Sequence, residues 1–304
     1  MTDSELHQIF RSRMQPYHGL APAVEPHLFQ LDGIKAVVFD VYGTLVSSGA
    51  GDISFVDGSD RQEELDRLMR SNGKPWTVNT DYQDWHREYL AAIQDSHHAS
   101  KLLGVAFPEV DILNIWRALF YNWTIKGWII LDPGMDWDKW IPRLAVEFET
   151  IINPIAPAPG AFNVLTSLRK AGLKLGIVSN AQFYTLIMLE AISSMTMQEL
   201  GFEEALSVWS YQEGQAKPEK GLYEKLKQQA GKAFQLEPSQ ILYIGNDVKK
   251  DYLPALSMGF KVALYAGDPV SLRHINCLPD EVEGLQPLIL TRWEQLNQVL
   301  KNLV

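Results

Sequence analysis

The sequence lacks the features of a secreted or membrane-spanning protein. A single cysteine, Cys277, excludes an intramolecular disulfide. No apolar run approaches the roughly 20 residues that cross a bilayer as a helix. Residues 1–7 have neither the basic start nor the apolar centre of a secretory signal. These absences predict a soluble protein of the cytoplasm with no membrane partner.

The sequence is also poor in basic charge. Its 27 Lys and Arg residues face 37 Asp and Glu residues, which gives a formal net charge of -10. This excess argues against general affinity for nucleic acid or for an anionic membrane surface. A small anionic substrate remains compatible with it, because such a ligand needs only a local positive site. At 304 residues the chain forms one large domain or two smaller ones, and nothing in it indicates an oligomeric state.

The most informative stretch is residues 34–45, with the sequence IKAVVFDVYGTL. An apolar run stops at Asp40, and Gly43 then allows a tight turn. The run predicts a strand of a parallel sheet that is buried on both faces. Ligands of such sheets bind beyond the carboxyl ends of the strands, where Asp40 would lie. A carboxylate there can be a nucleophile, a base, a metal ligand or only a helix N-cap.

Two later apolar runs end in the same way. Residues 173–178 repeat the form of the first strand and end at Ser179 and Asn180. Residues 241–244 make a third run, which ends at the segment GNDVKKD, residues 245–251. Three predicted strands therefore end in small, polar or acidic residues, which is typical of a reaction site at one edge of a sheet.

A lysine lies between the second and third of these runs. Lys217 comes before Pro218, which disfavours a helix in the preceding backbone and can begin the next one, so the lysine is placed on a loop at a helix entrance. Shorter strands are predicted at residues 206–209 and 261–265. Strands that alternate with helices predict an α/β fold, with a Rossmann-like parallel sheet and helices on both faces.

The pattern divides the chain into three regions. Residues 1–33 contain several prolines and predict a short helix followed by an irregular N-terminal arm. Residues 49–153 carry apolar residues at helical spacing and most of the tryptophans, which predicts an inserted helical subdomain with an aromatic core. The α/β core then comprises residues 34–48 and 154–304, and a terminal helix is expected over residues 293–303.

Together, the strand-end segments resemble the four sequence motifs of the haloacid dehalogenase superfamily, whose members are mostly magnesium-dependent phosphatases. The resemblance covers residues 34–45 and 155–265, and the inserted helices resemble the superfamily's cap. One such motif is a weak signal, but four in the right order on the predicted elements are a strong one. The resemblance implies a hydrolase.

The resemblance also implies a role for each strand-end residue. Asp40 would be the nucleophile and would form a covalent aspartyl intermediate, which splits one difficult displacement into two easier ones. Thr44 and Ser179 would donate hydrogen bonds to the transferring group, and Asn180 would contact the substrate beside them. Lys217 would neutralise negative charge on Asp40 and on the transferring group.

A magnesium ion is a further implication. Its ligands would be the carboxylates of Asp40 and Asp247 and the backbone carbonyl of Tyr42, with Asp251 close by. Asn246 is an alternative ligand, because it directly follows the glycine of the last motif. We favour Asp247, since its spacing to Asp251 fits the paired acids of the family.

Tyr42 departs from the phosphatase pattern. Most phosphatases of the superfamily have an aspartate here that protonates the leaving oxygen, and a phenol with a pKa of about 10 is a poor replacement. The form Asp-x-Tyr-Gly-Thr resembles the dehalogenase branch, in which the halide leaves without a proton and Tyr42 would line the substrate site. That branch works without a metal and needs an arginine from the cap to receive the halide. The candidates are Arg61, Arg67, Arg70, Arg87 and Arg117.

Charge counting favours a phosphatase. Asp40, Asp247 and Asp251 carry three negative charges against one positive charge on Lys217, and such a site repels a phosphate dianion unless a divalent cation is added. We therefore predict magnesium-dependent hydrolysis of a small phosphate ester. The alternative is a metal-independent 2-haloacid dehalogenase. A non-catalytic binding module on the same core is a third possibility, which the presence of both Asp40 and Lys217 disfavours.

Overall fold

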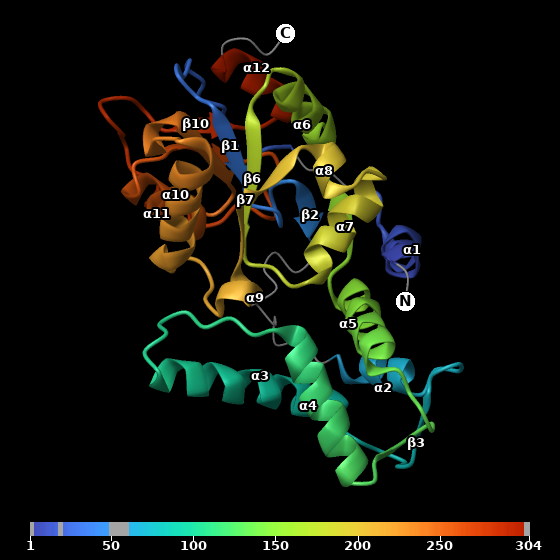
Figure 1. Cartoon of the computed structure of the whole chain (residues 1–304). Coiled ribbons are helices and arrows are strands. Elements are labelled where there is room, and N and C mark those ends of the chain that lie inside the picture. Colours follow the sequence, from blue (N-terminus) through green and yellow to red (C-terminus); the bar gives the residue numbers. More distant parts are fainter. Residues whose placement is uncertain (1–2, 18–20, 49–60, 301–304) are drawn as a thin grey trace.

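The centre of the protein is a sheet of six parallel strands (Figure 1). The computed structural model describes residues 3–17, 21–48 and 61–300. Across the sheet the strands are β10 (Leu288–Leu290), β9 (Lys261–Tyr265), β8 (Ile241–Gly245), β1 (Ala36–Phe39), β6 (Lys174–Ser179) and β7 (Phe202–Trp209). The predicted α/β fold with a Rossmann-like parallel sheet is confirmed.

Strand β1 lies in the middle of the sheet and is buried on both faces. Its side chains alternate, so Val37 and Phe39 join the apolar core on one face while Ala36 and Val38 join the core on the other. The first face is covered by α6 (Ala161–Lys170), α7 (Tyr184–Ser193) and α12 (Leu296–Val299). The second face is covered by α10 (Lys220–Phe234) and α11 (Leu253–Ser257). Short helices α8 (Met197–Leu200) and α9 (Ser210–Glu213) flank β7.

The helical insertion lies beyond the carboxyl edge of the sheet (Figure 1). Its described elements are α2 (Gln62–Met69), β3 (Trp76–Val78), α3 (Trp85–Leu102), α4 (Ile112–Ile125), β4 (Ile129–Leu131) and α5 (Trp137–Ile152). The chain leaves and re-enters the core through an antiparallel pair, β2 (Val46–Ser48) with β5 (Ile155–Pro157). Of the predicted insertion, residues 49–60 lie outside the described residues, so its exact limits stay a prediction.

Aromatic side chains fill the interior of the insertion. Trp85, Trp116 and Trp123 are fully buried. The rings of Trp85 and Trp123 meet edge to face at 4.7 Å, and the ring of Trp116 lies 4.9 Å from that of Tyr89. Edge-to-face contacts add to the stability gained from burying such large apolar surfaces. These tryptophans form a core, as their helical spacing indicated.

The N-terminal region packs against both the core and the insertion. Helix α1 (Asp3–Arg13) packs against α5 and α7. Further along, His27 forms an antiparallel bridge with Ile289 of β10, with N···O distances of 3.1 and 2.9 Å. The predicted helix and irregular arm are therefore present, and the arm lies along the outer edge of β10.

The C-terminal part differs from the expectation in three places. Within the described residues the predicted terminal helix is shorter, because a 3-10 turn, Trp293–Gln295, precedes α12 and the helix ends at Val299. Residues 301–303 of that prediction lie outside the described residues. Strand β10 was not predicted, because its three residues make too short an apolar run. A π-helical turn, Val248–Tyr252, precedes α11. No helix within the described ranges is long and apolar enough to cross a bilayer.

Candidate active site

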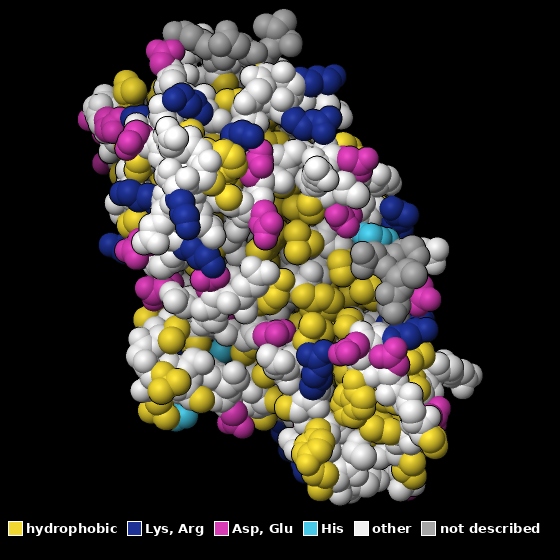
Figure 2. All heavy atoms as spheres, in the orientation of Figure 1, with side chains coloured by type: hydrophobic (Ala, Val, Ile, Leu, Met, Phe, Trp, Pro, Cys, Tyr) yellow, Lys and Arg dark blue, Asp and Glu magenta, His cyan; other side chains and the backbone are white. Residues whose placement is uncertain are grey.

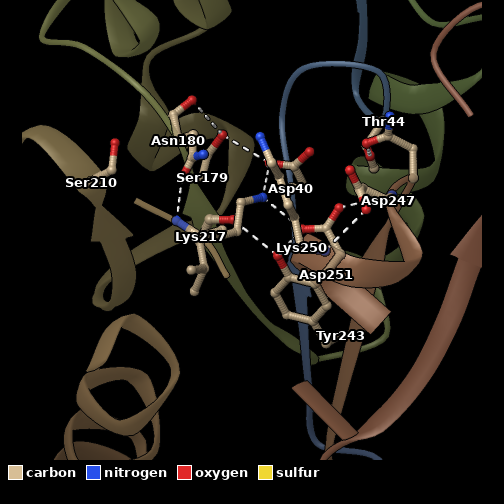
Figure 3. Close-up of polar contacts among 12 residues, drawn as sticks. Asp40, Thr44, Ser179, Asn180, Ser210, Lys217, Tyr243, Asp247, Lys250 and Asp251 are labelled. Carbon is tan, nitrogen blue, oxygen red and sulfur yellow. Dashed lines mark hydrogen bonds and ion pairs between the residues drawn. The ribbon is translucent and has the colours of Figure 1, made fainter. Parts of the chain in front are cut away.

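The carboxyl ends of β1, β6 and β8 place the predicted residues side by side. Phe39 pairs in register with Ile177 of β6 and with Ile244 of β8. The residues that follow these strands therefore meet at one edge of the sheet, and Lys217 joins them from the loop before α10 (Figure 3). This edge faces the inserted helices.

Asp40 follows β1 directly and has one anchored carboxylate oxygen. Its backbone N–H donates to the Ile244 carbonyl at 2.9 Å. Its Oδ1 accepts hydrogen bonds from Ser179 Oγ at 2.9 Å and from Lys217 Nζ at 2.6 Å. Its Oδ2 accepts none from the part of the chain that the structure describes. The carboxylate is thus held in one orientation with its second oxygen available for chemistry.

Lys217 bridges two carboxylates. Its Nζ lies 2.6 Å from Asp40 Oδ1 and 2.6 Å from Asp251 Oδ1, and its side chain is only 3% exposed. Burial alone lowers the pKa of Lys217, but the negative charges of Asp251 and Asp40 outweigh this effect and hold the pKa above its ordinary value. The ammonium therefore stays charged at neutral pH and offsets part of the negative charge of the site.

Asp251 is the second carboxylate that contacts Lys217. Its Oδ1 also lies 2.9 Å from the Tyr243 hydroxyl, and its Oδ2 accepts the backbone N–H of Asp247 at 3.0 Å. Burial raises the pKa of Asp251 above its usual range, and the charge of Lys217 opposes that shift. A Cβ atom at Gly245 would collide with this carboxylate, so the position requires glycine.

Thr44 contacts another predicted site residue, and its expected contact with the transferring group stays a prediction. It is fully buried, and its Oγ1 donates to Asn246 Oδ1 at 3.2 Å. The Asn246 amide in turn donates to the Ser271 carbonyl at 2.5 Å, which fixes the orientation of the amide. Because a hydroxyl has one proton, Thr44 cannot also donate to a substrate in this arrangement. Thr44 and Asn246 instead join the turn after β1 to the segments after β8 and β9.

Ser179 and Asn180 bind to different parts of the site. The Ser179 hydroxyl donates to Asp40 Oδ1, and its expected contact with the transferring group stays a prediction. Asn180 Oδ1 accepts the backbone N–H of Lys217 at 2.7 Å and so fixes the lysine loop. The Asn180 amide nitrogen donates no hydrogen bond to any described residue, which leaves it available for a ligand.

Asp247 caps the π-helical turn with one oxygen. Its Oδ1 accepts the backbone N–H groups of Lys249 at 2.8 Å and Lys250 at 3.0 Å, and it lies 2.9 Å from His274 Nδ1. Its Oδ2 accepts no hydrogen bond from the described residues. Asn246 Oδ1 already accepts from Thr44 and is neutral, whereas Asp247 Oδ2 is charged and accepts no hydrogen bond from the described residues, so this arrangement favours Asp247 over Asn246 as a metal ligand.

The comparison with protein families agrees with this geometry. The model of the haloacid dehalogenase (HAD)-like hydrolases matches residues 34–259. The chain belongs to this family. It is therefore a hydrolase, and the matched range spans β1, the insertion and the strand-end residues through Asp251.

Solved structures similar to this HAD-like hydrolase include enzymes of two kinds. A HAD phosphatase from Thermococcus onnurineus is 16% identical, with 87% of this chain and 97% of that chain covered and a TM-score of 0.42. An L-2-haloacid dehalogenase from Xanthobacter autotrophicus, with chloropropionic acid covalently bound, is 20% identical, with 86% and 96% covered and a TM-score of 0.44. No curated protein matches the chain. These similarities do not distinguish between the two activities.

Tyr42 is an even poorer acid in this HAD-like hydrolase than its residue type suggests. The side chain is 5% exposed, and its hydroxyl lies 3.0 Å from Thr185 Oγ1 at the start of α7. Burial and then the negative charge of Glu149 raise the pKa of Tyr42 well above its ordinary value, and the hydrogen bond to Thr185 only partly opposes this. At neutral pH the phenol keeps its proton and releases it to a leaving group with difficulty.

The donor set suits a hard divalent cation. Asp40 Oδ2, Asp247 Oδ2 and the Tyr42 carbonyl oxygen accept no hydrogen bonds from the described residues, and such oxygens are the ligands that magnesium prefers. Across the described ranges, no group of three or more His, Cys, Asp and Glu side chains is arranged to hold a metal ion. The expected site has only two carboxylates and a backbone carbonyl, so the remaining ligands would be water and substrate.

The five arginines considered for halide binding have partners within the insertion. Their ion pairs are Arg61 with Glu64, Arg67 with Glu63, Arg70 with Asp66, Arg87 with Asp84 and Arg117 with Asp138. These pairs lie on the surface of the inserted helices. They do not single out an arginine for the site.

The sequence analysis missed several residues that contact predicted site residues, among them Tyr243 and His274. Tyr243 lies inside the third apolar run, where an aromatic residue indicates a core strand, yet its hydroxyl reaches Asp251. His274 lies 27 residues after Asp247 on a loop without a motif, so no local signal joins the two. A tyrosine near the end of a strand that is followed by acidic residues is at most a weak indication of a site residue.

Proposed function

We propose that this HAD-like hydrolase is a magnesium-dependent phosphatase that acts on a small phosphate ester, with Asp40 as the nucleophile. One observation carries the proposal. Asp40 Oδ2, Asp247 Oδ2 and the Tyr42 carbonyl oxygen are free of hydrogen bonds from described residues, in a site where three aspartates outnumber one lysine. Such a site needs positive charge before it can receive a dianion.

The proposed reaction has two displacements at phosphorus. Asp40 Oδ2 attacks the phosphorus atom, the ester P–O bond breaks, and its electron pair remains on the leaving oxygen. A water molecule then attacks the phosphorus of the aspartyl phosphate, which releases inorganic phosphate and restores Asp40. Lys217 and Ser179 hold Asp40 Oδ1 in place during both steps, so that Oδ2 stays directed outward.

Asp40, Asp247 and the Tyr42 carbonyl would hold the magnesium ion. When bound, magnesium supplies positive charge that offsets the carboxylates and the phosphate oxygens. Lys217 adds a second positive charge, which its two short contacts keep in place. The Asn180 amide nitrogen is available to donate to a phosphate oxygen.

The position of Tyr42 limits the leaving group. Because its phenol is buried and has a raised pKa, the leaving oxygen must depart without a proton from this residue. Aryl or acyl phosphates meet that requirement, since their leaving groups are stable as anions. We therefore expect them to react faster than simple alkyl phosphates.

The weak acidity of the buried Tyr42 phenol also supports the second candidate, a metal-independent 2-haloacid dehalogenase. There Asp40 would attack the carbon that carries the halogen, and the halide would leave with the electron pair of the broken bond. No acid is needed for that step, so the weak acidity of Tyr42 would not slow it. The acidic surplus around Lys217 weighs against this candidate, because a halide would leave into a negatively charged site.

A paired assay tests both candidates. The purified protein is given 4-nitrophenyl phosphate or a short 2-halo acid, each with magnesium and with a chelator in excess. The proposed function expects phosphate release that stops on chelation and returns when magnesium is restored. Halide release in the presence of the chelator, without phosphate release, would establish the dehalogenase instead.

A further inference from the structure

The loop before α4 is joined to the loop that carries Lys217. Pro108 and Gln215 form an isolated antiparallel bridge. The backbone N–H of Glu109 donates to the Gly214 carbonyl at 3.1 Å, and that of Ala216 donates to the Phe107 carbonyl at 2.7 Å. The insertion therefore contacts the core backbone at the residue directly before Lys217.

A buried carboxylate lies at this junction. Glu109 is 9% exposed, and its Oε2 accepts a hydrogen bond from Ser210 Oγ at 2.9 Å. Its Oε1 accepts from Gln182 Nε2 at 3.3 Å and from the backbone N–H of Val110 at 3.0 Å. Burying a carboxylate is unfavourable unless hydrogen-bond donors surround it, so Glu109 depends on these donors to stay buried.

Gln182 strengthens the junction from the core side. Its Oε1 accepts the backbone N–H of Ile112, the first residue of α4, at 2.9 Å. Its Nε2 also donates to the Val110 carbonyl at 2.8 Å. One core side chain therefore satisfies an unpaired group at the start of α4 and contacts Glu109 at the same time.

A continuous series of contacts leads from Glu109 to the nucleophile. Ser210 Oγ accepts the backbone N–H of Ala181 at 2.8 Å, and Ala181 directly follows Asn180. Asn180 Oδ1 accepts the backbone N–H of Lys217 at 2.7 Å, and Lys217 Nζ lies 2.6 Å from Asp40 Oδ1. Glu109 thus contacts the loop before Lys217 through its backbone and the Asn180 loop through Ser210, and these are the two loops that position the lysine.

We infer that Glu109 is a positioning residue, which acts through Ser210 and the Asn180 loop to place Lys217 against Asp40. This inference rests on the covalent step proposed at Asp40, and it holds for either leaving group. It also gives the insertion a role in the reaction itself, beyond covering the substrate. A displacement of about 1 Å at a reacting group can cost about a hundredfold in rate.

The main test is a double-mutant cycle on turnover. Glu109→Ala is expected to lower kcat at least about tenfold in the otherwise unchanged protein, and less than about twofold when Lys217→Ala is already present. Ser210→Ala, which removes one oxygen atom, should give a smaller loss of the same kind. Glu109→Gln keeps an acceptor for Ser210 and should restore most of the rate. Equal losses in both backgrounds, or no loss from Glu109→Ala, would overturn the inference.

A second measurement needs no turnover and separates this inference from the proposed function. Hydrogen exchange is followed at the backbone amides of Ala181 and Lys217. Glu109→Ala and Ser210→Ala should speed their exchange at least about fivefold, while that of Ile244 in β8 stays unchanged. Glu147→Gln is the control, because Glu147 is a buried acid of α5 that pairs with Lys74. Unchanged exchange at Ala181 and Lys217 in both Glu109→Ala and Ser210→Ala would contradict the inference even if the enzyme proves to be a phosphatase.

Discussion

The α/β core and the inserted helices are stabilised in different ways. At the carboxyl edge of the core, buried charges are matched by named partners, as in the contacts of Lys217 with Asp40 and Asp251. The interior of the insertion is instead built from fully buried rings such as Trp85, Trp116 and Trp123. Charge pairs require specific atoms at specific distances, whereas apolar packing accepts many residue combinations. The two groups that we propose to react or to carry charge, Asp40 and Lys217, therefore belong to the core.

The surfaces of the two regions differ as well. Figure 2 shows hydrophobic side chains gathered over the lower part of the molecule, where the inserted helices lie. Among the described residues, the large hydrophobic side chains exposed in the insertion are Tyr82, Leu102, Leu103, Phe107, Tyr121, Ile125 and Ile130. Those exposed in the core are Leu253, Val270 and Leu285. Among the described residues, the surface of the insertion therefore carries more large apolar side chains than the surface of the core.

The largest expected effect is in the core. Asp40→Asn removes the negative charge of the nucleophile and should lower kcat at least about a thousandfold. The fold should remain, because an amide can still accept from Ser179 and Lys217. Asp136→Asn is a matched control, since Asp136 only caps the exposed start of α5. Normal turnover by Asp40→Asn, measured with the purified protein, would remove the covalent mechanism.

The counterpart in the insertion is Trp123→Ala. This change empties a fully buried site and should lower the free energy of unfolding by about 3–5 kcal/mol, measured by urea denaturation. Trp123→Phe should cost much less, because the indole nitrogen has no hydrogen-bond partner among the described residues. A similar cost for both variants would show that the insertion depends on the exact shape of the indole ring and does not accept other apolar residues there.

Asp247→Asn tests the metal site. An amide is a weaker ligand than a carboxylate, so the magnesium concentration that gives half-maximal rate should rise about tenfold to a hundredfold. Asn246→Ala should leave this concentration nearly unchanged, because the Asn246 side chain binds Thr44 and Ser271. The reverse pattern in a magnesium titration of initial rates would make Asn246 the ligand.

The smallest expected effect concerns Tyr42. Tyr42→Asp introduces the missing acid and should raise the rate for alkyl phosphates about tenfold, with little change for aryl phosphates that leave without a proton. The ratio of the two rates is the measurement, and Tyr42→Phe is the control without an acid. An equal change for both substrates would mean that proton transfer does not limit the reaction.

The sequence predicts local features of the molecule better than contacts between residues that are far apart in the chain. An apolar run that ends in Asp40, Ser179 or Asp247 is a local pattern, so the strands and their terminal residues could be found from the sequence. The contacts of Asp247 with His274 and of Glu109 with Ser210 join residues far apart in the sequence and leave no local pattern. The contact of Thr44 with Asn246 likewise could not be known before the strands were placed side by side.

The substrate could not be predicted for a physical reason. The apolar periodicity of α3 and α4 shows which faces are buried, but the same periodicity serves a helix core and a binding wall. Leu102 and Leu103 illustrate the limit, since they match the helical pattern and yet are 75% and 87% exposed. Periodicity specifies burial on average and does not specify the shape of a pocket.

The contact between His27 and Ile289 has a consequence for aggregation. A strand at the edge of a sheet offers unpaired N–H and C=O groups to any other extended chain. Here both backbone groups of Ile289 are already bonded to His27, so the N-terminal arm occupies the outer edge of β10. The arm around His27 therefore protects the β10 edge from pairing with another copy, and we expect a shortened chain without residues 21–33 to form intermolecular sheets more readily through that edge.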